Sequence, residues 1–184
     1  RTVIAMTLTI AIGASWTFGL AYLLVGHLNS STGFLFSIIV GNGINFGIIY
    51  MARYLEARRE HPAGESVRMA QAGTWVATLT AATAASCAYG SLPVTNFRGF
   101  KEFGLIGGSG MLLCWTATYL LLPPILLLFE RLKPIQPPRG WLARLRGLYG
   151  RPFAALASGY PRAVLFAGAL ITLTTGYLAV GYLR

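Results

Sequence analysis

Long runs of apolar residues without a charged side chain dominate this sequence. An α-helix needs about 20 such residues to cross the ~30 Å hydrocarbon core of a bilayer. Runs of this kind cover Thr2–Val25, Gly33–Ala52, Trp75–Leu92, Phe103–Phe129 and Ala163–Leu183. We therefore predict an all-α membrane protein, built as a bundle of five transmembrane helices.

Charged residues are few, and most of them are basic. The 184-residue chain is 55% hydrophobic, has a mean hydropathy of +0.60 and carries 15 Lys or Arg against 5 acidic residues, all of them glutamates. Paired carboxylates of the kind that hydrolases use are therefore scarce, and we expect no enzymatic activity. The basic residues lie between the apolar runs and form no stripe along a soluble face, so we expect no nucleic-acid partner.

The distribution of Lys and Arg among the connections predicts the topology, because positive side chains stay on the cytoplasmic side. Two connections are rich in basic residues, and only Arg98, Lys101 and Arg184 fall on the opposite side. The predicted cytoplasmic residues are Arg1, Arg53, Arg58, Arg59, Arg68, Arg131, Lys133, Arg139, Arg144, Arg146, Arg151 and Arg162. We also read a short surface helix after Pro62 and Gly64 that leads into the third span.

The long connection, residues 134–161, is rich in proline at its start and basic after it. Trp141 and the leucines that follow lie on one arc of a helix, with Arg144, Arg146 and Arg151 off that arc. This pattern is typical of a cytoplasmic interfacial helix in the lipid headgroups, although a disordered basic linker is the alternative. The chain then divides into a four-helix membrane bundle (1–133), this linker helix (134–161) and the first helix of a following half (162–184).

Two amides lie in the middle of the second run, within Gly41-Asn42-Gly43-Ile44-Asn45-Phe46-Gly47. Polar side chains at this depth are expensive in free energy and so are candidates for function. Asn42 and Asn45 share one helix face, and we expect Asn45 to face the inside of the bundle, because an unpartnered amide in hydrocarbon costs several kcal/mol. Gly41, Gly43 and Gly47 permit close approach of another helix. Amides that only bond neighbouring backbone are the structural alternative.

Other runs contain small, polar or helix-breaking residues. Gly104 and Gly108 are further candidate packing positions, and the hydroxyls of Thr78, Thr80, Thr83 and Ser86 suggest a helix that packs inside the bundle. Pro123 and Pro124 are expected to kink or end the fourth span. We expect Glu102, beside Lys101, to be a solvated residue of an interfacial ion pair.

Several motifs together resemble the resistance-nodulation-division (RND) superfamily, in the branch of the MMPL lipid exporters and the hopanoid exporters. The stretch 41–46 and the following Tyr50, Arg53-Tyr54 and Glu/Arg-rich turn are similar to the fourth membrane helix of that family. Phe103-Gly104 looks like the opening of its sixth helix, and Leu122-Pro123-Pro124-Ile125-Leu126 like the end of that helix. The resemblance covers roughly residues 33 to 134.

The resemblance implies that the five spans are helices three to seven of a twelve-helix fold. The proton-relay acid of the family maps onto Asn45, flanked by Asn42 and Phe46, where this chain departs from the pattern. It follows either that the relay resides in the other half or that the protein is not a proton-driven pump.

We therefore predict a transporter module that exports a hydrophobic or lipid-like substrate from the bacterial inner membrane as a multi-pass protein. A lipid- or sterol-sensing domain without transport is the alternative. Membrane lipids, the hydrophobic substrate and further copies of the chain, in a dimer or trimer, are the expected partners. His27 and His61 lie in opposite connections, so we expect no metal site. We also expect no cofactor.

Overall fold

A computed structural model describes residues 2–26, 30–132 and 159–182, and every element in these ranges is helical. The chain forms two compact units, residues 1–137 and 138–184. The all-α fold class predicted from the sequence is confirmed for the part of the chain that the structure describes. The predicted linker helix with Trp141, Arg144, Arg146 and Arg151 lies outside these residues.

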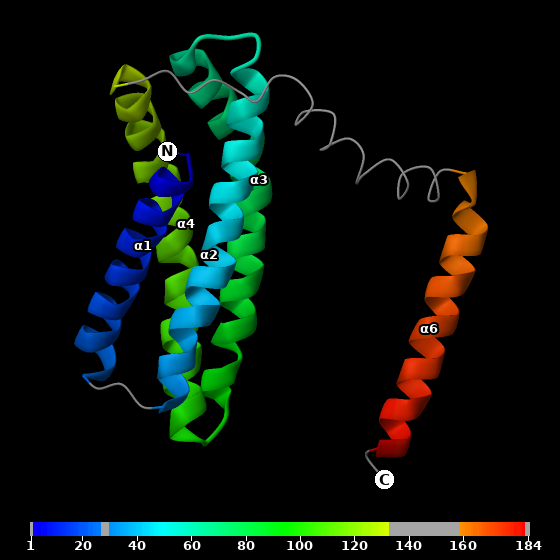
Figure 1. The fold of residues 1–184 in the computed structure, drawn as a ribbon. Helices are drawn as coiled ribbons and strands as arrows, with labels where there is room; N and C mark the ends of the chain where they lie inside the picture. The colour runs from blue at the N-terminus through cyan, green and yellow to red at the C-terminus, as the bar shows by residue number, and fades with distance from the viewer. Residues whose placement is uncertain (1, 27–29, 133–158, 183–184) are drawn as a thin grey trace. The chain divides into compact units, whose positions relative to one another are not determined.

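The first unit is a bundle of four long helices that run alternately up and down (Figure 1). Helix α4 contacts each of the other three helices. The elements are α1 (Thr2–Val25), α2 (Ser30–Ala57), α3 (Ala63–Gly90), the 3₁₀ turn η1 (Leu92–Val94) and α4 (Arg98–Leu132). The second unit contains α6 (Pro161–Tyr182).

Local sequence explains where the helices end. Gly26 has φ 77°, a left-handed conformation that glycine adopts readily, and its amide bonds the Tyr22 carbonyl to close α1. Pro62 precedes α3 with extended dihedral angles. Pro93 follows the end of α3 by three residues and lies within η1.

The predicted surface helix before the third span is wrong as a separate element. Helix α3 runs without interruption from Ala63 to Gly90, so the surface segment and the apolar run form one helix. The break lies at Pro62 alone, because Gly64 falls in the first helical turn, where backbone amides have no intrahelical partner in any case.

Helix α4 also continues through Pro123 and Pro124 to Leu132, so the prolines do not end the fourth span. Tyr119 and Leu120 lie four residues before these prolines, and their carbonyls lose the partner amides of a regular helix.

Within residues 2–26, 30–132 and 159–182, three helical segments are long and apolar enough to cross a membrane: Thr2–Val25, Gly33–Ala57 and Arg98–Leu132. Helix α3 is long enough to cross a membrane, but it is rich in Ala, Thr and Gly and is therefore less hydrophobic than the three spans. The apolar segment of α6, Pro161–Thr175, is shorter than the length needed to cross a membrane. Five transmembrane helices therefore remain a prediction.

Small residues at every fourth position bring α1 and α3 close to their neighbours. Because residues four apart share a helix face, each set forms one buried stripe. The stripes are Ala5, Thr9, Gly13, Thr17 and Ala21 on α1, and Ser66, Ala70, Thr74, Thr78 and Ala82 on α3. Their hydroxyls are satisfied within the helix, as Thr9 Oγ1 donates to the Ala5 carbonyl (2.8 Å) and Thr17 Oγ1 to the Gly13 carbonyl (2.9 Å).

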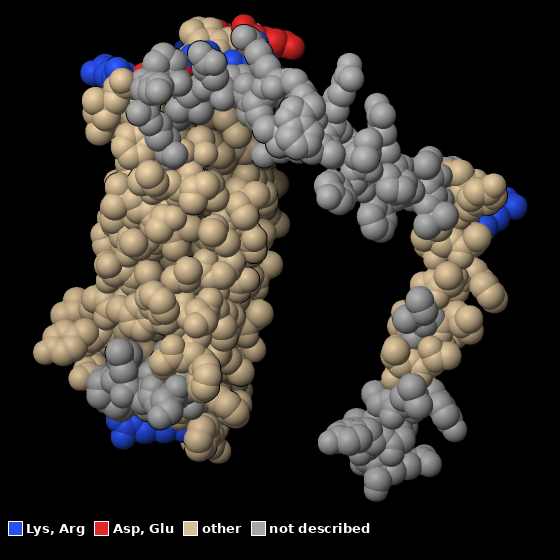
Figure 2. All heavy atoms as spheres, viewed as in Figure 1, with Lys and Arg blue, Asp and Glu red and all other residues tan. Residues whose placement is uncertain are grey.

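The outside of the bundle is apolar in its middle and charged at its ends (Figure 2). Exposed fractions of 79% for Leu23, 72% for Phe34 and 60% for Leu120 describe side chains suited to lipid. The charged residues at the end formed by the 53–68 connection and the end of α4 are Arg53, Glu56, Arg58, Arg59, Glu60, Glu65, Arg68, Glu130 and Arg131. The 53–68 connection and the end of α4 thus lie at the same end of the bundle.

Candidate functional site

The two asparagines of the second span lie on the outer surface of the bundle. Asn42 and Asn45 are exposed, and neither amide hydrogen-bonds to another residue within the ranges that the structure describes. The prediction that Asn45 faces the inside is therefore wrong for this four-helix bundle. Phe46, predicted as part of the same site, is buried instead.

Helix geometry explains this orientation. Gly43, Phe46, Gly47 and Tyr50 recur at the spacing of one helix face and are all buried. Asn45 precedes Phe46 by one residue and is therefore turned by about 100° from it. Because Tyr50 is fully buried and its hydroxyl donates to the Val67 carbonyl (3.2 Å), this face is held against α3 and α4, and the amides turn outward.

Four of the five candidate packing glycines lie against another helix, judged by the contacts that an added Cβ would make. At Gly43 the nearest atom would be Cys114 Cβ (3.3 Å), and at Gly47 it would be Met6 Cε (3.5 Å). At Gly104 it would lie 2.6 Å from the Tyr89 carbonyl oxygen, and at Gly108 it would lie 3.2 Å from the Ser86 carbonyl oxygen. Gly41 is exposed with open space around it, so its predicted packing role is not met in this bundle.

A polar network that the sequence did not reveal lies between α3 and α4. Trp115 Nε1 donates to Thr78 Oγ1 (3.1 Å), and Thr78 donates to the Tyr119 hydroxyl (2.7 Å). The Tyr119 hydroxyl lies 2.7 Å from Thr74 Oγ1, which donates to the Ala70 carbonyl (2.7 Å). With Thr78 donating to Tyr119 and Tyr119 donating to Thr74, every hydroxyl of this network has a partner. Thr78 Oγ1 also lies 2.9 Å from the Thr74 carbonyl oxygen.

The network fixes two aromatic rings in place. Trp115 and Tyr119 are one turn apart on α4 and stack with 4.9 Å between ring centroids and 24° between planes. Thr74 and Thr78 are one turn apart on α3. The sequence shows two pairs at a spacing of four residues, Thr74 with Thr78 and Trp115 with Tyr119. It does not show that the two pairs face each other.

The other hydroxyls predicted to pack the third run divide into two groups. Ser86 Oγ donates across to the Gly108 carbonyl on α4 (2.8 Å), while Thr80 and Thr83 are exposed and bond back to their own helix. Helix α3 therefore has one buried face and one exposed face within this bundle. The prediction of a helix enclosed by the bundle is wrong for its outer face.

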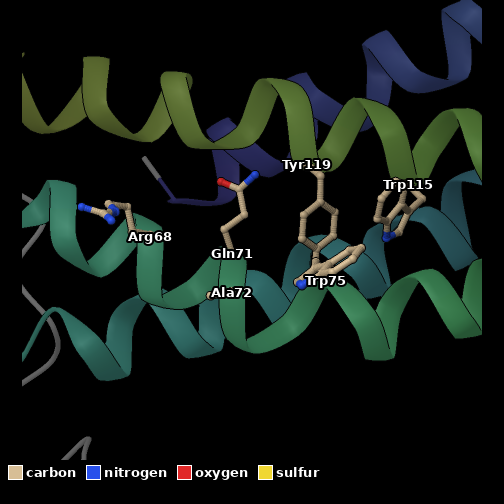
Figure 3. Close-up of a pocket in the computed structure, with 6 residues that line it drawn as sticks. All are labelled: Arg68, Gln71, Ala72, Trp75, Trp115 and Tyr119. Atoms are coloured by element: carbon tan, nitrogen blue, oxygen red, sulfur yellow. The ribbon is translucent and has the colours of Figure 1, made fainter.

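The stacked rings form one wall of an open pocket of about 430 Å³ between α3 and α4. Its lining is Arg68, Gln71, Ala72 and Trp75 from α3 with Trp115 and Tyr119 from α4. Figure 3 shows Arg68, Gln71 and Trp75 in a row along α3, with Tyr119 and Trp115 reaching toward that helix from α4.

An ion pair joins Arg58, the residue after α2, to Glu130 on α4 at the arginine-rich end. Arg58 donates through Nε (2.9 Å) and Nη2 (2.5 Å) to Glu130 Oε1, and the Tyr54 hydroxyl lies 3.4 Å from Glu130 Oε2. The hydrogen bond to Glu130 raises the pKa of the Arg58 guanidinium above its ordinary value. Arg58 Nη1 also donates to the His61 carbonyl (3.1 Å), so this residue ties together three segments of the chain.

Glu102, at the opposite end, departs from its predicted setting. Its carboxylate accepts from Arg98 Nε (2.8 Å) one turn earlier, and the residue is 7% exposed. The prediction of a solvated residue is therefore wrong. Arg98 lies four residues before Glu102 and therefore on the same helix face, so its side chain reaches the carboxylate. Lys101 is adjacent in the sequence and points in a different direction around the helix.

These features define a class of protein: an α-helical membrane domain with small-residue helix packing and an apolar belt. The model of the MMPL family matches residues 1–155. The chain belongs to the MMPL family, which confirms the resemblance on which the sequence interpretation rested.

Among curated relatives, the chain is similar to two hopanoid transporters named HpnN. It is 32% identical over 130 residues to the one from Burkholderia multivorans and 30% identical over 133 residues to the one from Rhodopseudomonas palustris. These matches cover 70% and 71% of this chain but 15% of each relative. A putative membrane protein of Methanocaldococcus jannaschii is 28% identical over 125 residues, covering 67% of this chain and 32% of that protein.

Proposed function

We propose that this chain is part of the membrane domain of an RND-type transporter that exports a hydrophobic or lipid-like substrate across the bacterial inner membrane. The observation that carries the proposal is the MMPL family match over residues 1–155, together with similarity to two hopanoid transporters. The apolar belt between two charged ends supports it, because such a bundle is suited to a bilayer.

The placement of acidic residues bears on how transport is energised. All five glutamates lie near the ends of the described bundle, at positions 56, 60, 65, 102 and 130. The resemblance to the family implies that Asn45 stands where other members have their relay acid. An amide does not bind and release a proton near neutral pH. We therefore propose that proton coupling, where it exists, uses groups outside this chain.

The exposed amide face supports a second part of the proposal. Asn42 and Asn45 are available to further helices of the full-length protein, because no element of this bundle covers them. Hydrogen bonds from such helices would satisfy the amides in the hydrocarbon. We propose this face as the side of the bundle that meets the other half of the transporter.

A transport assay tests the proposal directly. The full-length protein in vesicles is given a fluorescent lipid or a hopanoid, with and without a pH gradient. We expect net movement of lipid by the wild-type protein. No movement of any lipid under either condition, with the protein folded and inserted, would overturn the proposal and leave lipid sensing, which no observation on this chain favours.

The variant Asn45→Asp tests position 45. A carboxyl group binds and releases a proton where an amide does not, so we expect transport by this variant to depend more steeply on external pH than transport by the wild-type protein. Asn42→Asp, one turn earlier on the same face, is the matched control and is expected to change the profile less. Superimposable pH profiles for wild type and Asn45→Asp would reject a functional role for position 45.

A further inference from the structure

The pocket between α3 and α4 is lined from α3 by three exposed hydrogen-bond donors that have no partner among the described residues. Arg68, Gln71 and Trp75 line it from one face of α3, because residues at i, i+3 and i+7 share a face. Within the described ranges, no hydrogen bond or ion pair engages the side chain of any of the three. Arg68 also carries a positive charge, and none of the described residues that line the pocket is acidic.

The nearest acidic side chain on the same helix is directed elsewhere. Glu65 lies one turn before Arg68 and lines an adjoining hollow that also includes Arg68. Its Oε2 atom lies 3.5 Å from His61 Nδ1, four residues earlier in the chain. The positive charge of Arg68 therefore has no close counter-ion among the described residues, and the pocket is suited to an anionic group.

The opposite wall is aromatic and rigid. Trp115 and Tyr119 are held by the hydrogen-bond chain through Thr78 and Thr74, so their rings are already in place before a ligand arrives. Beyond the pocket the surfaces are apolar, with exposed fractions of 58% for Val76 and 38% for Leu112. A molecule with a charged end at Arg68 would therefore place an apolar body along Trp75 and toward the middle of the belt.

We propose that this pocket binds an anionic phospholipid, with the headgroup phosphate on Arg68 and Gln71 and the glycerol and acyl region against Trp75 and Trp115. The phosphate satisfies donors that have no partner among the described residues, and Trp75, seven residues beyond Arg68 on α3, is suited to the boundary between headgroups and hydrocarbon. A free phosphate ion would satisfy the donors but would leave the aromatic wall without a contact. The site does not depend on the cargo or the direction of transport.

Quenching of tryptophan emission tests the proposal in the full-length protein. The protein is reconstituted in phosphatidylcholine discs with brominated phosphatidylglycerol or, at the same mole fraction, brominated phosphatidylcholine. Emission from Trp75 is obtained by difference against Trp75→Phe. Both lipids carry a phosphate, but phosphatidylcholine also carries a cationic choline that would lie near Arg68. We therefore expect the relative binding constant at Trp75 to favour the anionic lipid by about fivefold, the effect of one basic residue near a membrane surface.

Matched variants separate a site from a general surface potential. Arg68→Gln is expected to abolish the preference, and Arg68→Lys to retain most of it. Arg59→Gln removes the same charge from the same end of the bundle, outside the pocket, and is expected to leave the preference unchanged. Equal quenching by the two lipids in the wild-type protein, or equal losses in Arg59→Gln and Arg68→Gln, would overturn the proposal.

A competition arm distinguishes a lipid from free phosphate. Sodium phosphate at matched ionic strength is expected to leave the quenching ratio unchanged. Loss of the ratio under that condition would overturn the lipid assignment, because it would show a site for phosphate itself. Transport is not measured in these experiments, so their outcome is independent of the proposed function.

Discussion

The outer face of α2 and the interface between α3 and α4 use polar residues in opposite ways. On α2, Asn42 and Asn45 are exposed and make no hydrogen bond within the described residues. Between α3 and α4, Thr74, Thr78 and Tyr119 are buried, and each finds a partner at 2.7 Å. Both regions lie within apolar helices, so the difference does not come from composition.

The comparison teaches that polar residues in an apolar helix have two distinct meanings. A network in which every polar group has a partner holds helices together and needs no further contacts in the apolar interior. Unpartnered amides on an outer face indicate contacts beyond the bundle, because a bare amide in hydrocarbon costs several kcal/mol. The interface between α3 and α4 explains how the bundle is held together, and the outer face of α2 is the face that we propose meets further helices.

Two glycines, one in each region, should give the largest difference. Gly104→Ala places a Cβ 2.6 Å from the Tyr89 carbonyl and from Pro93 Cδ, so we expect a loss of about 2–3 kcal/mol in the free energy of unfolding. Gly41→Ala meets no atom and is expected to be neutral or slightly stabilising through helix propensity. Denaturation of the two variants in mixed micelles measures the difference, and equal stabilities would contradict the packing described for the α3–α4 interface.

Removing one hydroxyl from the network tests whether it stabilises the interface. Tyr119→Phe leaves Thr74 and Thr78 without their shared partner, and we expect a cost of about 1–2 kcal/mol in unfolding free energy. Tyr22→Phe, at a tyrosine that is 73% exposed, is the control and is expected to have no measurable effect. The interpretation fails if both variants unfold at the same denaturant concentration as the wild-type protein.

The smallest expected effect concerns two ion pairs that begin on α2 or at its end. Arg58, directly after α2, and Glu130 on α4 have side chains that are 23% and 10% exposed. A double-mutant cycle with glutamine at both positions should give a coupling energy of about 1 kcal/mol. Arg53 and Glu56 are 42% and 64% exposed within one helix, so their coupling should be about 0.3 kcal/mol. A coupling for the first pair no larger than for the second would show that Arg58 does not tie the helices together.

Several features of the protein could be predicted from the sequence because they depend on local composition. The limits of α1 agree with the predicted run Thr2–Val25, since an uncharged apolar stretch closed by Gly26 specifies a helix and its end. Family membership was also readable, because the motif around Asn45 and the Leu122-Pro123 ending are short and ordered along the chain.

The rotation of each helix about its own axis could not be predicted in the same way. Asn45 was expected inside, because burial of polar groups was judged from one helix alone. In the structure, Phe46 and Tyr50 take the inner face of α2, since their burial against α3 and α4 is possible only once those helices are in place. The same is true of Glu102, whose burial depends on the arrangement around the start of α4.

The sequence by itself determined that this is a helical membrane protein of the MMPL family, because apolar runs, the arginine distribution and short motifs are properties of consecutive residues. Only the tertiary structure decided which faces meet. In the hydrogen-bond chain from Trp115 to Ala70, the directly bonded residues that lie farthest apart in the sequence are Thr74 and Tyr119, 45 positions apart. The pocket that contains Arg68 exists for the same reason: two separate helices must lie side by side before their donors and rings form a site.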